Sequence, residues 1–231
     1  PATALLLAWR PLLEPSFVDE LLEMQVTPRL CEQLARWPAQ LSTGAATPDV
    51  WLLPWRPLLP TGLAPLADAL RIKLAAVIAS WDVADEAASS ACKDLLSPWA
   101  DELEASSWRL LVLRHVLPKL AAVLDSLEVR WPVQLEFAAV RAALAWTGVV
   151  PCALLIRLLA EHLFPEVANA LRTWLEHAPD YAEVTAWYLG WKKLFSERAP
   201  TLLHEEAYRE QLNAILGSVR VHLADPGGAG A

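Results

Sequence analysis

Few side chains in this sequence are spaced as catalytic or metal-binding groups. His204-Glu205-Glu206 places three ligand-type residues together, but a zinc-binding helix needs a second histidine four residues later, and none is there. The glycine motifs of phosphate loops, dinucleotide folds and nucleophile elbows are missing as well. We therefore predict that the chain is not an enzyme and needs neither a metal nor a cofactor.

The acidic residues do not suggest a catalytic pair either. Asp101, Glu102 and Glu104 follow Pro98 closely. Carboxylates in the first turn of a helix are stabilised by the helix dipole. We interpret these three residues as the start of a helix rather than as a general acid and base.

One stretch, 183–198, combines aromatic and basic residues. In a helix its aromatic rings lie on the apolar side, and two lysines lie near the helix end, where cations suit the dipole. Two interpretations stay open: core filling with a terminal charge pair, or a surface that binds RNA or an acidic partner. The candidate partner-binding residues are Trp187, Tyr188, Trp191, Lys192 and Lys193.

Two smaller basic groups raise the same alternatives with fewer aromatic neighbours. The first is Arg71 with Lys73, and the second is Arg114 with His115 and Lys119. Each is read either as a solvated helix face or as part of a binding surface.

Composition indicates a folded, acidic protein. Apolar residues make up 55% of the 231 residues, and the formal net charge is −8, which opposes general attraction to nucleic acid. Cys31, Cys92 and Cys152 lie far apart, so the sequence predicts no disulfide framework or zinc knuckle and favours a reducing compartment.

The most apolar stretch, 137–160, is interrupted by Arg141, Pro151 and Arg157. A spanning helix needs about 20 apolar residues without such charges. We expect two buried helices around a Thr-Gly turn, no membrane contact and no signal peptide.

The elements that carry these residues all have helical periodicity. Apolar positions recur at helical spacing, and no strand pattern is found. The predicted buried stripes are Leu66-Leu70-Leu74-Val77-Ile78-Trp81, Leu113-Leu117-Leu120-Leu124-Leu127, Val167-Ala170-Leu171-Trp174-Leu175 and Val184-Trp187-Tyr188-Trp191.

Polar and proline residues mark predicted helix starts and loops. The predicted N-caps are Thr27 before Pro28, Ser97 before Pro98, Asp180 in a capping box with Glu183, and, more weakly, Ser16 with Asp19. Residues 39–49 are expected to form a loop and 225–231 a disordered tail.

Repetition shapes the fold prediction. An apolar pair, a proline and an amphipathic run ending near a tryptophan recur around Pro28, Pro65, Pro118 and Pro165. A unit that cannot bury its own apolar face must stack on its neighbours, and proline inside a helix bends it. The expectation is an all-α, irregular, solenoid-like (HEAT-like) stack of helix pairs with proline-kinked helices, in one domain over 1–224.

The most similar repeat is Trp-Arg-Pro-Leu-Leu, at 9–13 and again at 55–59. We expect the two blocks to close one helical unit and aim the next. Trp9 and Trp55 pack inward, Pro11 and Pro57 stop or bend the chain, and the paired leucines begin the next buried face. With twelve tryptophans in the chain, core filling is the first interpretation and partner contact the second.

These blocks open a series of motifs that resembles the GCFC domain of the tuftelin-interacting protein family. The series continues through Trp51-Leu52-Leu53-Pro54-Trp55, Arg71 to Leu74, Trp81 to Asp85, Leu96 to Trp99, Trp108, Val116 to Leu120, Phe164-Pro165 and Trp174 to Ser196. The resemblance covers about 7–215. Its most specific part is Trp187-Tyr188-Leu189-Gly190-Trp191-Lys192, while Leu53, Glu166 and Val167 depart from the family pattern.

The resemblance implies a role that composition does not. It implies a nuclear, non-enzymatic scaffold of spliceosome disassembly on the intron-lariat complex, in pre-mRNA splicing. The implied partners are spliceosomal proteins and a DEAH-box RNA helicase, which a G-patch segment outside this chain activates. Contact with nucleic acid is then indirect, and the alternative is a domain that binds RNA or GC-rich DNA directly. The residues expected to build the scaffold are Trp9, Pro11, Trp51, Pro54, Trp55, Pro57, Trp81, Trp99, Pro118, Pro165 and Trp174.

Overall fold

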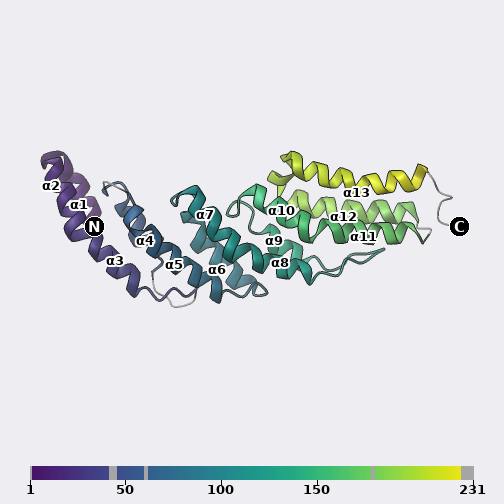
Figure 1. The fold of residues 1–231 in the computed structure, drawn as a ribbon, viewed down its shortest axis with the longest axis horizontal. Coiled ribbons are helices and arrows are strands. Elements are labelled where there is room, and N and C mark those ends of the chain that lie inside the picture. Colours follow the sequence, from purple (N-terminus) through teal and green to yellow (C-terminus); the bar gives the residue numbers. More distant parts are fainter. Residues whose placement is uncertain (1, 42–45, 60–61, 178–179, 225–231) are drawn as a thin grey trace. The chain divides into compact units, whose positions relative to one another are not determined.

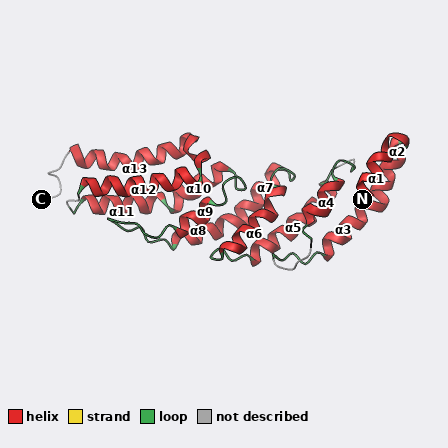
Figure 2. Cartoon of the chain, turned by 180° about the vertical axis from the view of Figure 1, so that it is seen from behind, coloured by secondary structure: helices red, strands yellow, loops and turns green. Residues whose placement is uncertain are grey.

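The computed structural model describes residues 2–41, 46–59, 62–177 and 180–224. All elements in these ranges are helices or turns (Figure 2), apart from one isolated bridge between Thr147 and Val150. The all-α prediction is therefore confirmed for the described part of the chain. The predicted tail 225–231 and the middle of the predicted loop 39–49 lie outside the described residues.

The chain forms two compact units, 1–115 and 116–231, which Figure 1 shows in chain order from purple to yellow. Whether they make up the single domain expected for 1–224 stays a prediction. The first unit contains α1 (Ala2–Trp9), η1 (Arg10–Leu12), α2 (Pro15–Leu21), η2 (Leu22–Val26), α3 (Thr27–Arg36), α4 (Pro48–Leu52), η3 (Leu53–Trp55), α5 (Ala64–Ser80), α6 (Glu86–Leu96), η4 (Ser97–Trp99), α7 (Ala105–Leu111) and most of η5 (Val112–Val116). The second contains α8 (Leu117–Asp125), α9 (Ala138–Leu144), α10 (Cys152–His162), α11 (Phe164–Leu175), α12 (Tyr181–Arg198), η6 (Pro200–His204) and α13 (Glu206–Ala224).

Helix α5 organises the first unit. It packs on α3 and α6, and its predicted stripe from Leu66 to Ile78 is fully buried. The side chain of Lys73 extends from α5 to the end of α3, where its Nζ donates hydrogen bonds of 2.7 Å to the carbonyls of Ala35 and Trp37. These are late carbonyls of α3, which have no partner within the helix, so Lys73 caps α3.

Two of the four repeated prolines follow a wide (π) turn inside a continuous helix. The turn η2 ends two residues before Pro28, and η5 ends two residues before Pro118. A wide turn accommodates the missing N–H and the ring of a following proline. Pro65 and Pro165 instead stand in the first turn of α5 and α11, where proline fits without disruption.

The wide turns also explain where the stripe predictions were wrong. Val18, Leu22, Leu30 and Leu34 are buried at multiples of four residues. Residues spaced by four gradually move around a helix of 3.6 residues per turn. The extra residue of the π turn brings the later positions back to the buried side of the helix. The same shift applies around η5, so in the second predicted stripe only Leu120 and Leu124 are fully buried, while Leu113, Leu117 and Leu127 are partly exposed.

The cap predictions had mixed outcomes. Asp180 caps α12 by accepting from the backbone N–H of Ala182 at 2.8 Å, and Asp85, which had not been predicted as a cap, does the same for α6. The other three predicted N-caps were wrong, because those residues lie inside helices that begin earlier or run on: Thr27, Ser97 and Ser16. The hydroxyl of Thr27 donates to the carbonyl of Leu22.

The acidic residues after Pro98 also lie elsewhere than expected. Helix η4 ends at Trp99, so Asp101 and Glu102 occupy a turn and Glu104 precedes α7. The Oε2 atom of Glu102 lies 2.7 Å from Nε of Arg56, in a partly buried ion pair. This acid therefore anchors the second Trp-Arg-Pro-Leu-Leu block.

The two blocks have different surroundings. Trp9 is 54% exposed, so its predicted inward packing was wrong, whereas Trp55 is half-buried and both following leucines are buried. The blocks are nevertheless linked, because Nη1 of Arg10 donates to the carbonyl of Pro57 at 3.0 Å. Of the other predicted structural residues near these blocks, Pro11 lies in η1, Trp51 is half-buried in α4, Pro54 lies in η3 and Pro57 in the turn after it.

Tryptophan is mainly a core residue here, as the first interpretation stated. Eight of the twelve rings are buried: Trp37, Trp81, Trp99, Trp108, Trp146, Trp174, Trp187 and Trp191. Several indole N–H groups find partners, such as the hydroxyl of Ser89 for Trp81. Trp37 and Trp99 bury an N–H that has no hydrogen-bond partner among the described residues.

The apolar stretch 137–160 folds as two helices, as predicted. Helix α9 ends at Leu144 and α10 begins at Cys152. Gly148 in the turn has φ of 92°, a conformation that glycine adopts without strain. Among the described residues, no helix combines the length and apolar character required to cross a bilayer.

Candidate partner-binding surface

Helix α12 carries the five candidate residues. In Figure 1 it runs beside α11 and α13 in the second unit. Trp187 meets Trp174 of α11 edge-to-face at 6.1 Å between ring centroids, and Phe195 packs against Tyr208 of α13 at 5.3 Å. Aromatic pairs at these distances and angles are favourable. The buried side of α12 is thus fixed by rings from both neighbouring helices.

A loop without regular secondary structure, 127–137, covers one end of this aromatic core. The indole Nε1 of Trp187 donates to the carbonyl of Arg130 at 2.9 Å. The ring of Trp131 stacks on Trp174, with centroids 5.8 Å apart and planes at 13°. The loop is therefore attached to two core tryptophans.

Gln134 holds the loop together from within. It is only 9% exposed. Its Oε1 accepts from the N–H of Arg130 at 2.6 Å, and its Nε2 donates to the carbonyls of Glu128 and Glu136 at 3.2 and 2.8 Å. One side chain thus replaces the backbone pairing that a strand or helix would supply.

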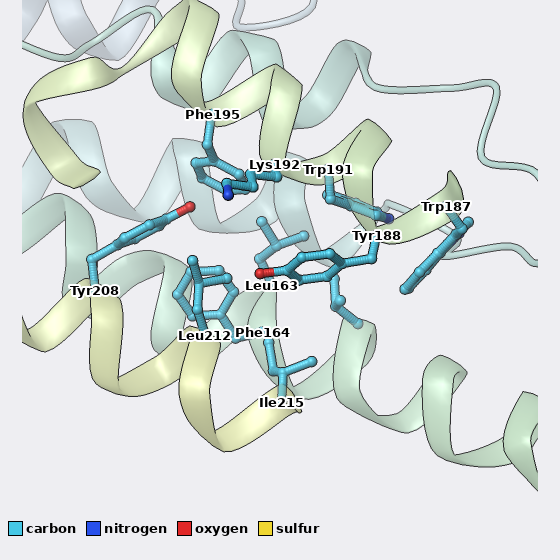
Figure 3. Close-up of a pocket in the computed structure, with 11 residues that line it drawn as sticks. Leu163, Phe164, Trp187, Tyr188, Trp191, Lys192, Phe195, Tyr208, Leu212 and Ile215 are labelled. Carbon is cyan, nitrogen blue, oxygen red and sulfur yellow. The ribbon is translucent and has the colours of Figure 1, made fainter. Parts of the chain in front are cut away.

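A small hollow lies between α11, α12 and α13. In Figure 3 the hydroxyls of Tyr188 and Tyr208 and the amine of Lys192 point toward the same space, which rings and aliphatic side chains surround. Its volume is about 20 Å³, too small for a substrate or a partner side chain. Burial raises the pKa of Tyr208 well above its usual value, with a further contribution from nearby Tyr188, so its hydroxyl keeps its proton to a higher pH than an exposed tyrosine does.

The structure separates the five candidates into two groups. Trp187 and Trp191 are buried in the core, which accords with the core-filling interpretation. Tyr188 is half-buried, and Lys192 and Lys193 are exposed. The expected position of the lysines at the helix end was wrong, since α12 continues to Arg198. Their binding role stays a prediction.

Sequence reasoning missed Leu189 as a surface residue. It is 52% exposed and lies between Tyr188 and the two lysines along α12. Apolar and aromatic side chains form the centre of protein interfaces and polar groups the rim, so an exposed leucine beside Tyr188 is a candidate contact residue. The predicted buried stripe, which skips position 189, could have revealed it.

The smaller basic groups are rearranged by the fold. Lys73 is occupied in capping α3, while Arg71 lines a hollow together with Arg114 and His115. Lys119 is not part of that hollow's lining. Arg71 therefore shares a hollow with Arg114 and His115 of another helical segment, and not with Lys73, its neighbour in the sequence.

The groups considered for chemistry remain dispersed. His204 ends η6, and Glu205 precedes α13. Among the described residues, His, Cys, Asp and Glu do not gather in any group of three that could hold a metal. A pair not foreseen from the sequence joins α10 to α8, with Nδ1 of His162 2.6 Å from Oδ1 of Asp125.

Comparison with known proteins agrees with the resemblance seen in the motifs. Tuftelin-interacting protein 11 of Bos taurus is 32% identical over 216 residues, which cover 94% of this chain and 25% of the relative. The proteins of that name from Sus scrofa and Rattus norvegicus are each 31% identical over the same shares. The chain therefore spans about a quarter of the length of these curated relatives. A family model, described as GC-rich sequence DNA-binding factor-like protein (GCFC), matches residues 1–176, and the chain belongs to this family.

Proposed function

We propose that this chain is a non-enzymatic helical scaffold of the splicing machinery that acts through protein–protein contacts during spliceosome disassembly. The observation that carries the proposal is the similarity to tuftelin-interacting protein 11 over 94% of the chain. The proposal includes a nuclear location and spliceosomal protein partners. It also includes a DEAH-box helicase that is engaged through a G-patch segment outside this chain.

The geometry of α12 supports a role in contact rather than in chemistry. Tyr188, Leu189, Lys192 and Lys193 lie on a helix that Trp187 and Trp191 fix in the core. A rigid helix loses little conformational freedom when it binds. We define these four residues as the α12 surface and propose that it contacts an acidic protein partner.

The finer fold proposal, a solenoid-like stack of helix pairs, has support within the first unit. There α3, α5 and α6 pack in chain order, and the proline-preceding wide turn of η2 recurs in η5. In the second unit α13 packs back on α11 and α10, and α12 packs on α9, as in a bundle. We propose that the stacking is irregular for this reason.

The test is affinity capture from nuclear extract with the tagged chain and with a Leu189→Asp, Lys192→Glu, Lys193→Glu variant. We expect the wild type to recover spliceosomal proteins and the variant to lose most of them. Arg172→Glu, an exposed charge reversal on α11, is the matched control and should behave as the wild type. Recovery of no spliceosomal protein by the wild type would contradict the proposal.

A second candidate function, direct nucleic-acid binding, is favoured by the description of the family as DNA-binding factor-like. The net charge of −8 opposes it. Filter binding with RNA and GC-rich DNA at several salt concentrations separates the two functions. Direct binding requires sub-micromolar affinity that falls steeply with salt and weakens in Lys192→Ala, Lys193→Ala.

A further inference from the structure

A second surface lies in the first unit, between α5 and the segment formed by α7 and η5. A hollow of about 150 Å³ opens there, and we define it as the α5–α7 groove. Its apolar floor is formed by Ile72, Ala75, Leu110 and Leu111, and its rim by the cationic Arg71 and Arg114 together with His115. The first unit alone supplies every one of these residues.

The rim carries positive charge that is little compensated. Arg71 makes an ion pair of 3.0 Å with Asp68, but the carboxylate is highly exposed, so the pair contributes little stability and is readily exchanged. Arg114 and His115 form no ion pair within the described part of the chain. In a chain with net charge −8, the two arginines make this rim locally positive.

The apolar floor of the groove favours an acidic peptide over a nucleic-acid backbone as the bound anion. Ile72 is 67% exposed and Leu110 is 39% exposed. A phosphate backbone would pair with the arginines but would leave these aliphatic groups in water. An acidic amphipathic peptide satisfies both, because it buries an aliphatic side chain and presents carboxylates to the arginines.

We propose that the α5–α7 groove binds an acidic amphipathic helical segment of a partner protein. An aliphatic side chain of the segment lies on Ile72 and Leu110, and its carboxylates pair with Arg71 and Arg114. This inference rests on the proposed scaffold function and adds a contact site, with the chemical class of its partner, that is separate from the α12 surface.

The test uses fluorescence anisotropy with the purified chain and a labelled synthetic peptide whose leucines and glutamates follow helical spacing. Arg114→Glu should weaken binding at least about tenfold, equivalent to about 1.4 kcal/mol, and Ile72→Ser should weaken it several-fold. Arg109→Glu is the matched control, because Arg109 is exposed on α7 but does not line the groove. Its affinity should stay near that of the wild type, and unchanged helical circular dichroism verifies that the variants are folded.

Two matched probes decide which chemistry the groove recognises. A peptide with serine in place of leucine, and a single-stranded polyuridine RNA, should each bind much more weakly than the acidic peptide. The proposal is overturned if the RNA or the serine peptide binds equally well, if Arg114→Glu has no effect, or if the wild type does not bind the acidic peptide. Such a failure leaves capture through the α12 surface intact, so it can be told apart from failure of the scaffold function.

Discussion

Replacing Gln134 by alanine tests how the loop 127–137 is held. The substitution removes three hydrogen bonds to backbone groups. Each is worth about 0.5–1.5 kcal/mol net. Because the residues at the other ends of these bonds are themselves exposed, water recovers part of the loss. We therefore expect the free energy of unfolding to fall by about 2 kcal/mol.

The assay is urea denaturation followed by tryptophan fluorescence, with near-ultraviolet circular dichroism to detect loss of the stacked Trp131–Trp174 pair. Gln134→Glu keeps the size of the side chain and removes only its donor, so it separates the loss of hydrogen bonds from the loss of volume. The carboxylate still accepts from Arg130, but it offers no donor to the carbonyls of Glu128 and Glu136. We expect it to be at least as destabilising as alanine. The exposed Gln33 of α3 supplies the control, Gln33→Ala.

Gln134 and Trp187 bind the two backbone polar groups of one residue, the N–H and the carbonyl of Arg130. Trp187→Phe and Gln134→Ala should therefore be non-additive, with a coupling free energy of about 0.5–1 kcal/mol. A loss below about 0.5 kcal/mol for Gln134→Ala, together with additive effects, would refute the idea that this side chain organises the loop.

Three other outcomes are expected. Trp99→Ala should destabilise by about 3–5 kcal/mol, because the ring is fully buried, whereas exposed Trp9→Ala should stay within about 0.5 kcal/mol; thermal melts of both variants measure this difference. Burial raises the pKa of Tyr208, so above about pH 10 the unfolded chain releases a proton that the folded chain keeps, and stability falls as pH rises. Urea titrations across this range should show a smaller alkaline loss in Tyr208→Phe than in the wild type. Lys73→Met keeps the aliphatic stem but leaves the last carbonyls of α3 without their charged donor; a loss of about 1.5–3 kcal/mol in urea titrations is expected, and no loss would argue against capping.

The sequence predicts helices well wherever a single period runs without interruption. The stripe of α5 from Leu66 to Ile78 follows directly from its spacing. The stripe around Leu113 does not, because a wide turn changes the phase, and the proline after that turn has the same sequence setting as Pro65 and Pro165, where a helix begins instead. Periodicity therefore predicts the face of a regular helix but not a shift within it.

Links between distant residues lie beyond such reasoning. Arg10 binds the carbonyl of Pro57, and Arg56 pairs with Glu102, each across more than forty positions. The identical blocks around Trp9 and Trp55 become exposed and half-buried because their neighbours differ. The sequence locates the aromatic and basic stretch that forms the candidate site. It does not separate the core tryptophans from the surface lysines, because that separation depends on how α11 and α13 pack against α12.

Because each wide turn contains one residue more than an α-turn, it takes up that residue without changing the direction of the side chains after Pro28 and Pro118. Exchanging either proline for another residue leaves that surplus residue in place, so the side chains downstream keep their neighbours. Deleting one residue from the turn leaves an ordinary α-turn, so the later side chains keep their direction, whereas deleting one residue from a regular turn rotates everything beyond it by about 100°. Natural variation in this family should thus tolerate substitutions and single-residue deletions at these two turns, and exclude single-residue deletions from the regular helical turns beside them.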